Sequence, residues 1–258
     1  MKMRLVLITV IITSLWSCKE DAKKIEEVKS DVVETVVEKE AKVIYKSKKD
    51  TIMEYSGTTQ HIHAAKTQYY RWYQLYEREI TPKRIENQMG ILSDEVEITS
   101  VAGTLKGKEG YPERLKAYEG WKNAHHVQDI DVKSYKDGTL RIDAEIIYQN
   151  IKPTEEKNQV RIAYEIYTNP NNSNELPKLN VVNLKPVEQL EVTEFKDAYP
   201  TNRVLALMHY WLYNIEKMDG DATPFEKILA DKFELKFSEQ SIIANLDDFK
   251  VWVKNAAI

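Results

Sequence analysis

The chain has 258 residues, of which 42% are hydrophobic and 30% are charged. It is therefore long and apolar enough to bury at least one ordinary core, and it is not a disordered chain. Its 37 basic and 41 acidic residues give a formal net charge of −4, which supplies no excess positive potential for a phosphate backbone. A nucleic-acid partner is not expected.

The N-terminus has the anatomy of an export signal. Two basic residues precede the apolar run 5–12, which is too short to span a bilayer. The sequence that follows, LWSC at residues 15–18, resembles the lipobox of bacterial lipoproteins, in which the cysteine is lipidated and becomes the mature N-terminus. The resemblance implies a signal peptide over residues 1–17 and attachment to a membrane through a lipid on Cys18.

The residues after the lipobox point to the cell envelope. The start CKED at residues 18–21 resembles the surface-export signal of Bacteroidota lipoproteins. It implies an outer-membrane lipoprotein that faces outward, with a periplasm-facing orientation as the alternative. Cys18 is the only cysteine, so no disulfide can form within the exported domain. Residues 18–55 are rich in Lys and Glu and are expected to form a charged tether.

A helix with one aromatic face is predicted at the start of the folded part. The segment 56–59 has the residues of a helix start, and the helical pattern continues to Ile80. Because His61 and His63 are two apart, they do not share a helix face, and we expect both to be solvated. Four aromatic residues recur at helical spacing: Tyr69, Trp72, Tyr73 and Tyr76. Such a stripe is more typical of a core than of a cofactor platform.

A second helix, a hairpin and a third helix are predicted next. Thr81 and Pro82 have the residue types of a helix cap and a first-turn proline, opening a helix that ends near Leu92. Gly103 lies within residues 96–106 and Gly107 follows them, which predicts extended or hairpin structure there. A third helix is predicted over residues 111–122.

Four strands are predicted after the helices, at residues 125–135, 139–150, 159–168 and 176–187. The dipeptide Asp137-Gly138 is a hairpin signal between the first two. In the second strand the apolar residues occupy even positions from Leu140 to Tyr148, so these positions are predicted to face the core. The same parity places Tyr164 on the inner face of the third strand.

The first strand carries two neighbouring histidines. His126 and Gln128 share the parity of the apolar residues further along it, so both are expected to face inward. His125, Asp129 and Asp131 have the opposite parity and are expected to face outward. No metal site is therefore predicted from these histidines and aspartates, unless a β-bulge interrupts the strand.

This order of elements resembles the SnoaL-like, nuclear-transport-factor-2-like superfamily. The segments that carry the resemblance are YRWY at 70–73, LSDEV at 92–96, GYP at 110–112 and HHV at 125–127. The resemblance covers residues 58–187 and implies one domain over residues 56–190. It implies an α+β, cone-shaped fold, in which three helices pack in a curved, mainly antiparallel sheet with a pocket at its wide end.

A similar pattern begins again after this domain. Residues 204–218 repeat an aromatic helix, and residues 223–226 repeat the Thr-Pro helix start. Residues 229–235 echo residues 92–98. Recurrence of this kind is typical of tandem copies. Since no strands for a second sheet follow, we interpret residues 200–258 as a partial second copy, which we expect to be truncated.

The inner rows of the predicted cone give candidate residues for its pocket. His126, at the start of an inward row, is the candidate catalytic base. In relatives of this fold that isomerise or cyclise, pocket Asp and Tyr residues move protons, but the inner rows here show no clear carboxylate. The residues expected to line a ligand pocket are Trp72, Tyr76, Trp121, Gln128, Tyr148 and Tyr164.

Binding of a small apolar or amphipathic ligand without catalysis, and without a cofactor or metal, is therefore the function that we expect. The sequence has no Gly-rich phosphate loop, Gly-x-Ser-x-Gly elbow or His-Glu-x-x-His helix. The alternative is an isomerase, cyclase or hydrolase that uses His126. A third hypothesis is an interaction module that forms a homodimer through the outer face of the sheet, where Arg141 and Asp143 are predicted to lie.

Overall fold

The computed structural model describes residues 54–55, 59–170, 175–217, 219–237 and 240–256. The predicted signal peptide, Cys18 and almost all of the predicted tether lie outside these residues, so their assignments stay predictions. Among the described helices, none combines the length and apolarity needed to cross a bilayer.

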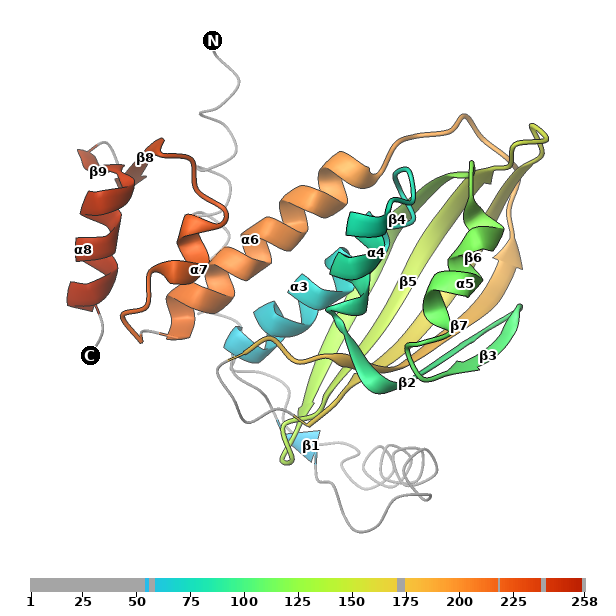
Figure 1. The fold of residues 1–258 in the computed structure, drawn as a ribbon, viewed down its shortest axis with the longest axis horizontal. Helices are drawn as coiled ribbons and strands as arrows, with labels where there is room; N and C mark the ends of the chain where they lie inside the picture. The colour runs from blue at the N-terminus through green and yellow to red at the C-terminus, as the bar shows by residue number, and fades with distance from the viewer. Residues whose placement is uncertain (1–53, 56–58, 171–174, 218, 238–239, 257–258) are drawn as a thin grey trace, which may run out of the picture. The chain divides into compact units, whose positions relative to one another are not determined.

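A seven-stranded sheet forms the centre of the fold, in the order β1-β4-β5-β6-β7-β2-β3. Neighbouring strands are antiparallel except for β2 and β7, which run parallel. The long strands β4 to β7 curve around the helices on one face (Figure 1). The fold is therefore α+β, with a curved and mainly antiparallel sheet. The strands are β1 (Glu54–Tyr55), β2 (Leu92–Ser100), β3 (Gly103–Lys106), β4 (Lys122–Tyr135), β5 (Leu140–Ile151), β6 (Lys157–Thr168) and β7 (Leu179–Gln189).

The predicted alternation is confirmed in β5 and β6. Even-numbered apolar side chains of β5, such as Ile142 and Ile146, are fully buried against the helices. Arg141 lies on the outer face, where it pairs with Asp143 and Glu165 at N···O distances of 2.9 and 3.3 Å. A homodimer through this charged face stays a prediction.

The helices on the inner face of the sheet begin as predicted and end earlier. The helices are α3 (Thr59–Gln74), α4 (Pro82–Met89), α5 (Tyr111–Leu115) and the 3₁₀ helix η1 (Lys116–Tyr118). The Thr81 side chain caps α4 by accepting a hydrogen bond from the Arg84 backbone N–H at 3.4 Å. Helix α3 ends six residues before the predicted Ile80. The third helix stops short of residue 122 because Gly120 has a positive φ of 75° and β4 begins at Lys122.

The C-terminal part repeats the order long helix, short helix, hairpin and helix. Its elements are α6 (Tyr199–Lys217), α7 (Thr223–Glu226), β8 (Lys232–Phe237), β9 (Gln240–Asn245) and α8 (Leu246–Ala256). Helix α6 packs along α3 (Figure 1), and its Ala206 and Tyr213 belong to the main core. Trp211 on α6 packs instead in a second, smaller core around Phe225 and Phe249. Helix α6 therefore takes part in both cores, and the interpretation of this part as a partial second copy stays a prediction.

Candidate functional site

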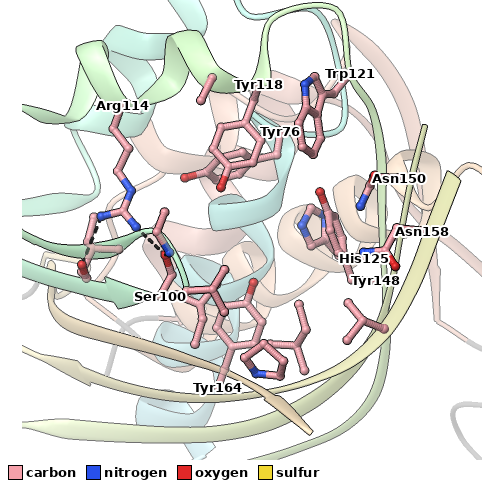
Figure 2. Close-up of a pocket in the computed structure, with 18 of the residues that line it drawn as sticks. Tyr76, Ser100, Arg114, Tyr118, Trp121, His125, Tyr148, Asn150, Asn158 and Tyr164 are labelled. Carbon is pink, nitrogen blue, oxygen red and sulfur yellow. Dashed lines mark hydrogen bonds between the residues drawn. The ribbon is translucent and has the colours of Figure 1, made fainter. Parts of the chain in front are cut away.

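A cavity of about 520 Å³ lies between the inner face of β4 to β7, the end of α3 and the α5–η1 segment. Its size is in the range of pockets that hold small organic ligands. Figure 2 shows aromatic side chains around it. Five of the residues predicted to line a pocket do line it: Trp72, Tyr76, Trp121, Tyr148 and Tyr164.

Tyrosine hydroxyls supply hydrogen-bonding groups to this mainly apolar wall. The Tyr148 hydroxyl donates to Asn123 Oδ1 at 2.6 Å, and the Tyr76 and Tyr111 hydroxyls are 2.5 Å apart. Burial raises the pKa of Tyr148 and of Tyr164 above the ordinary value of a tyrosine. These phenols are therefore neutral at physiological pH and can donate hydrogen bonds.

A buried histidine and a buried glutamate meet at the cavity. His125, on β4, lines the cavity, and its Nδ1 lies 3.1 Å from Oε1 of Glu77, which follows α3. The His125 side chain is 7% exposed and that of Glu77 is 0% exposed. The His125 ring stacks on Tyr73, with centroids 4.4 Å apart, and also contacts the Tyr148 ring. Packing on both sides holds the imidazole in one orientation.

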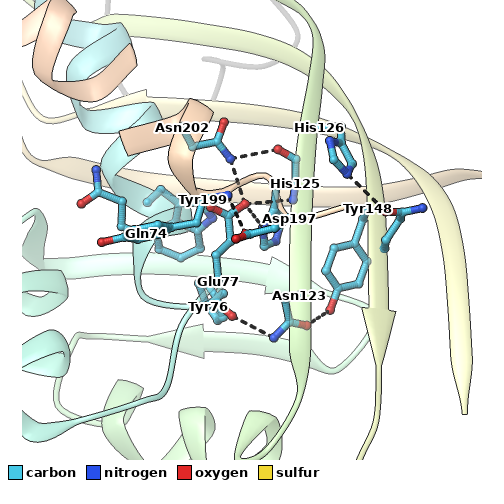
Figure 3. Close-up of polar contacts among 12 residues, drawn as sticks. Gln74, Tyr76, Glu77, Asn123, His125, His126, Tyr148, Asp197, Tyr199 and Asn202 are labelled. Carbon is cyan, nitrogen blue, oxygen red and sulfur yellow. Dashed lines mark hydrogen bonds and ion pairs between the residues drawn. The ribbon is translucent and has the colours of Figure 1, made fainter. Parts of the chain in front are cut away.

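The hydrogen bonds around Glu77 fix the tautomer of His125. Glu77 Oε1 accepts from the His125 backbone N–H at 2.9 Å and from Asn202 Nδ2 at 2.8 Å, as Figure 3 shows. A carboxylate oxygen that accepts from two N–H groups is an acceptor toward the imidazole too, so His125 Nδ1 carries the proton. His125 Nε2 is then unprotonated in the neutral ring, and it has no hydrogen-bond partner among the described residues. This is the arrangement of a general base.

The prediction that His126 and Gln128 face the pocket is wrong. The register of β4 against β5 shifts between Val127 and Asp129, so Gln128 is the extra residue of a β-bulge. The bulge reverses the inward parity for the residues before it, which turns His125 inward and His126 outward. His126 Nε2 lies 3.2 Å from Gln149 Oε1 (Figure 3), and His126 does not line the cavity. Gln128 is exposed.

The expectation that the site lacks a carboxylate is also wrong, because Glu77 is buried beside the cavity. A signal for Glu77 was present in the sequence. Tyr69, Tyr73 and Glu77 follow one another at intervals of four, and both tyrosines are fully buried. A charged residue that continues the apolar face of a helix must be paired when it is buried.

Two further polar residues in the cavity wall lack some of their hydrogen-bond or ion-pair partners among the described residues. Arg114 Nη2 donates to Ser100 Oγ at 2.5 Å and to the Gly103 carbonyl, and no carboxylate pairs with its guanidinium in the part of the chain that the structure describes. Asn150 is 3% exposed, and its Oδ1 has no hydrogen-bond partner among the same residues. Both can bind polar groups of a ligand (Figure 2).

The remaining histidines form no metal site with acidic neighbours in the described part of the chain. Within the described ranges, no three His, Cys, Asp or Glu side chains come close enough to share a metal ion. The expectation that His63 is solvated is wrong, because its Nδ1 lies 2.8 Å from Nδ1 of His209 on α6. Helix α6 covers this side of α3, which the pattern of α3 alone does not reveal.

No protein-family model matches this chain, and no curated protein matches it. Among solved structures, similar ones include hexachlorocyclohexane dehydrochlorinase LinA-type3 from Novosphingobium barchaimii LL02, with 12% identity over 51% of this chain and 90% of that one, at a TM-score of 0.44. ActVI-ORFA from Streptomyces coelicolor has 7% identity over 50% of this chain and 98% of that one, at a TM-score of 0.40. An uncharacterised protein with a cystatin-like fold from Caulobacter vibrioides has 10% identity over 50% of this chain and 91% of that one, at a TM-score of 0.40. Likenesses this distant say nothing about a ligand or reaction of this chain.

Proposed function

We propose that this chain binds a small apolar or amphipathic molecule in the aromatic cavity and transfers a proton on it, with His125 as the general base. The observation that carries the proposal is the His125–Glu77 pair, buried in the cavity wall with Nε2 of the imidazole unpartnered among the described residues. The expectation of binding without catalysis depended on a missing carboxylate. Since Glu77 supplies one, the enzymatic alternative becomes the better hypothesis, with His125 in place of His126.

The proton moves from a carbon of the ligand to His125 Nε2. The C–H bond breaks, and its electron pair stays in the ligand, where it forms a new double bond. In an isomerisation the electrons of an existing double bond move to a neighbouring atom, which takes the proton back from His125. In an elimination the leaving group departs with the electrons of its bond, and His125 afterwards gives the proton to water. Glu77 stabilises the imidazolium through the Nδ1 hydrogen bond, and the aromatic walls hold the apolar part of the ligand.

Kemp elimination tests this proposal without knowledge of the natural substrate. In 5-nitrobenzisoxazole a base removes the ring C–H proton, a C≡N bond forms and the N–O bond breaks to give a coloured phenolate. We expect the full chain to catalyse this reaction faster than free imidazole at the same concentration. We expect His125→Gln to lower the rate by about 100-fold, because a positioned base contributes a factor of this order.

His126→Gln is the matched control, because His126 neighbours His125 in the sequence but lies outside the cavity. It should leave the rate unchanged, and the melting temperatures of both variants show whether each is folded. A wild-type rate no higher than that of imidazole, or a folded His125→Gln chain with the wild-type rate, overturns the assignment of His125 as base.

We also propose that the domain acts at the outer membrane, held there by a lipid on Cys18. The support is the resemblance of residues 15–18 to a lipobox and of residues 18–21 to a surface-export signal. An outward orientation is the proposal, and a periplasmic one is the alternative.

A further inference from the structure

A second, smaller cavity lies among the helices, and no residue lines both cavities. Its volume is about 170 Å³, and its wall is polar. Three arginines line it, each from a different helix: Arg71 on α3, Arg84 on α4 and Arg203 on α6. Its other polar residues are Gln74 and Tyr199, both labelled in Figure 3, together with Asn87 and Gln88.

These three guanidinium groups have no acidic partner among the residues that the structure describes. Arg71 donates to Gln68 Oε1 at 2.9 Å and Arg84 to the Gln74 carbonyl at 2.8 Å, both of which are neutral acceptors. Across the described residues, no carboxylate oxygen lies within the 4.0 Å of an ion pair from Arg71, Arg84 or Arg203. Three cations around one small cavity repel one another, and no negative charge of the described chain offsets the repulsion.

Two acidic residues close to these arginines in the sequence are paired with other cations. Asp197 accepts two hydrogen bonds from Arg78, at 3.0 and 2.7 Å. Glu86 pairs with Lys83 at 2.8 Å on the exposed side of α4. Neither carboxylate is therefore available to neutralise the cavity.

The electrostatics of the cavity wall agree with an uncompensated positive charge. Burial opposes ionisation of Tyr199, yet the guanidinium groups of Arg84 and Arg203 lower its pKa below the ordinary value. Burial also lowers the pKa of Arg71, as expected for a cation withdrawn from water. The lowered pKa of Tyr199 thus reflects the positive potential of these guanidinium groups, which favours the arrival of an anion.

We propose that this second cavity binds a phosphate group, either as free inorganic phosphate or as the phosphate of a small ester. Guanidinium groups bind phosphate oxygens through paired N–H donors, and three of them match its charge and its several oxygens. The side-chain amides of Gln74 and Asn87 supply neutral donors beside them. The volume of about 170 Å³ has room for a phosphate group and part of an ester, and the site shares no lining residue with the aromatic cavity.

Calorimetric titration of the full chain, in mild detergent, with inorganic phosphate tests the proposal. The ionic strength is kept constant with sodium chloride, so that general screening does not contribute. We expect saturable binding to the wild type and at least about a tenfold loss of affinity in Arg203→Gln, because a charge-assisted hydrogen bond is lost. Arg203 is chosen because it is exposed, so its replacement does not disturb the core. The substitution also removes charge repulsion among the three arginines. The unliganded variant should therefore be at least as stable as the wild type.

Lys83→Gln is the matched control, since Lys83 is the neighbour of Arg84 but pairs with Glu86 on the surface, and it should bind phosphate like the wild type. A parallel titration with glycerol phosphate distinguishes the two sources of phosphate: tighter binding of the ester indicates an esterified ligand, and weaker binding indicates the free ion. Absence of saturable phosphate binding to the wild type, or equal affinity in Arg203→Gln, overturns the proposal.

Discussion

At the scale of single residues, Asn202 connects α6 to the proposed catalytic pair. Its Nδ2 donates to Glu77 Oε1 at 2.8 Å and to the His125 carbonyl at 3.0 Å, and the residue is 2% exposed. A buried carboxylate with few donors is costly, so Asn202 both stabilises the fold and orients Glu77 toward His125.

Replacement of Asn202 by alanine removes one donor from this carboxylate. We expect Asn202→Ala to lower the free energy of unfolding by about 1–3 kcal/mol, measured by urea denaturation. Thr201→Ala, at the neighbouring exposed position on α6, should change it by less than about 0.5 kcal/mol. Equal stability of the Asn202→Ala chain and the wild type would show that this hydrogen bond does not support Glu77.

The residues of the site were only partly predictable from the sequence. Alternation placed Tyr148 and Tyr164 at the cavity because β5 and β6 pair without interruption there. It failed for His125 and His126, since one extra residue at the bulge, Gln128, reverses parity and has no distinctive local signal. Glu77 could have been found at four-residue spacing from the buried tyrosines.

At the scale of helices and strands, α3 and α6 are joined by a pair of histidines. His63 Nδ1 lies 2.8 Å from His209 Nδ1, and the His209 ring stacks on Tyr70. Burial, together with the nearby His63 and Lys66, lowers the pKa of His209 from 6.5 to about 4. One ring nitrogen donates this hydrogen bond and the other accepts it, so protonation of both imidazole rings breaks the contact. Burial also lowers the pKa of His63, and Glu216, which lies 3.6 Å from His63 Nε2, offsets only part of this effect.

The lowered pKa of His209 makes the stability of this helix pair dependent on pH. The folded state binds fewer protons than the unfolded state between pH 6.5 and about 4, so the free energy of unfolding falls as the pH falls through this window. Through His209, the free energy of unfolding falls by at most about 1.4 kcal/mol for each pH unit. His209→Asn keeps a hydrogen-bonding group but cannot gain the proton.

Urea denaturation of both chains between pH 8 and pH 4 measures this effect. The wild type should lose more stability below about pH 6.5 than His209→Asn, and the two chains should show the same pH dependence above it. Parallel curves over the whole range would contradict the role of His209.

The starts of the elements were predicted better than their ends. Thr81 and Pro82 identified the first turn of α4, because capping is a local interaction. The pairing of α6 with α3 was not predicted, since it depends on residues far apart in the chain, such as His63 and His209, which are separated by 146 positions.

At the scale of the whole molecule, the proposed anchor makes a prediction about covalent modification. We expect the full chain, expressed in a bacterial host that carries out lipoprotein maturation and fed a clickable fatty acid, to be labelled. Cys18→Ser should not be labelled, because Cys18 is the only cysteine and the thiol is the site of attachment. Absence of label on the wild type, or label that persists in Cys18→Ser, would contradict the lipobox interpretation.

The central claim is that Glu77 holds His125 with its Nε2 atom open to the cavity. Nuclear magnetic resonance of the five histidines, labelled with ¹⁵N, reads the tautomer of each ring directly. The resonances of His125 and His126 are assigned with their glutamine variants, and 5-nitroindole, which has the shape of the Kemp substrate but no N–O bond, serves as the ligand. We predict that neutral His125 carries its proton on Nδ1 and that the ligand shifts its Nε2 resonance but not that of His126. A proton on Nε2 of His125, or a ligand that shifts only His126, would contradict this account.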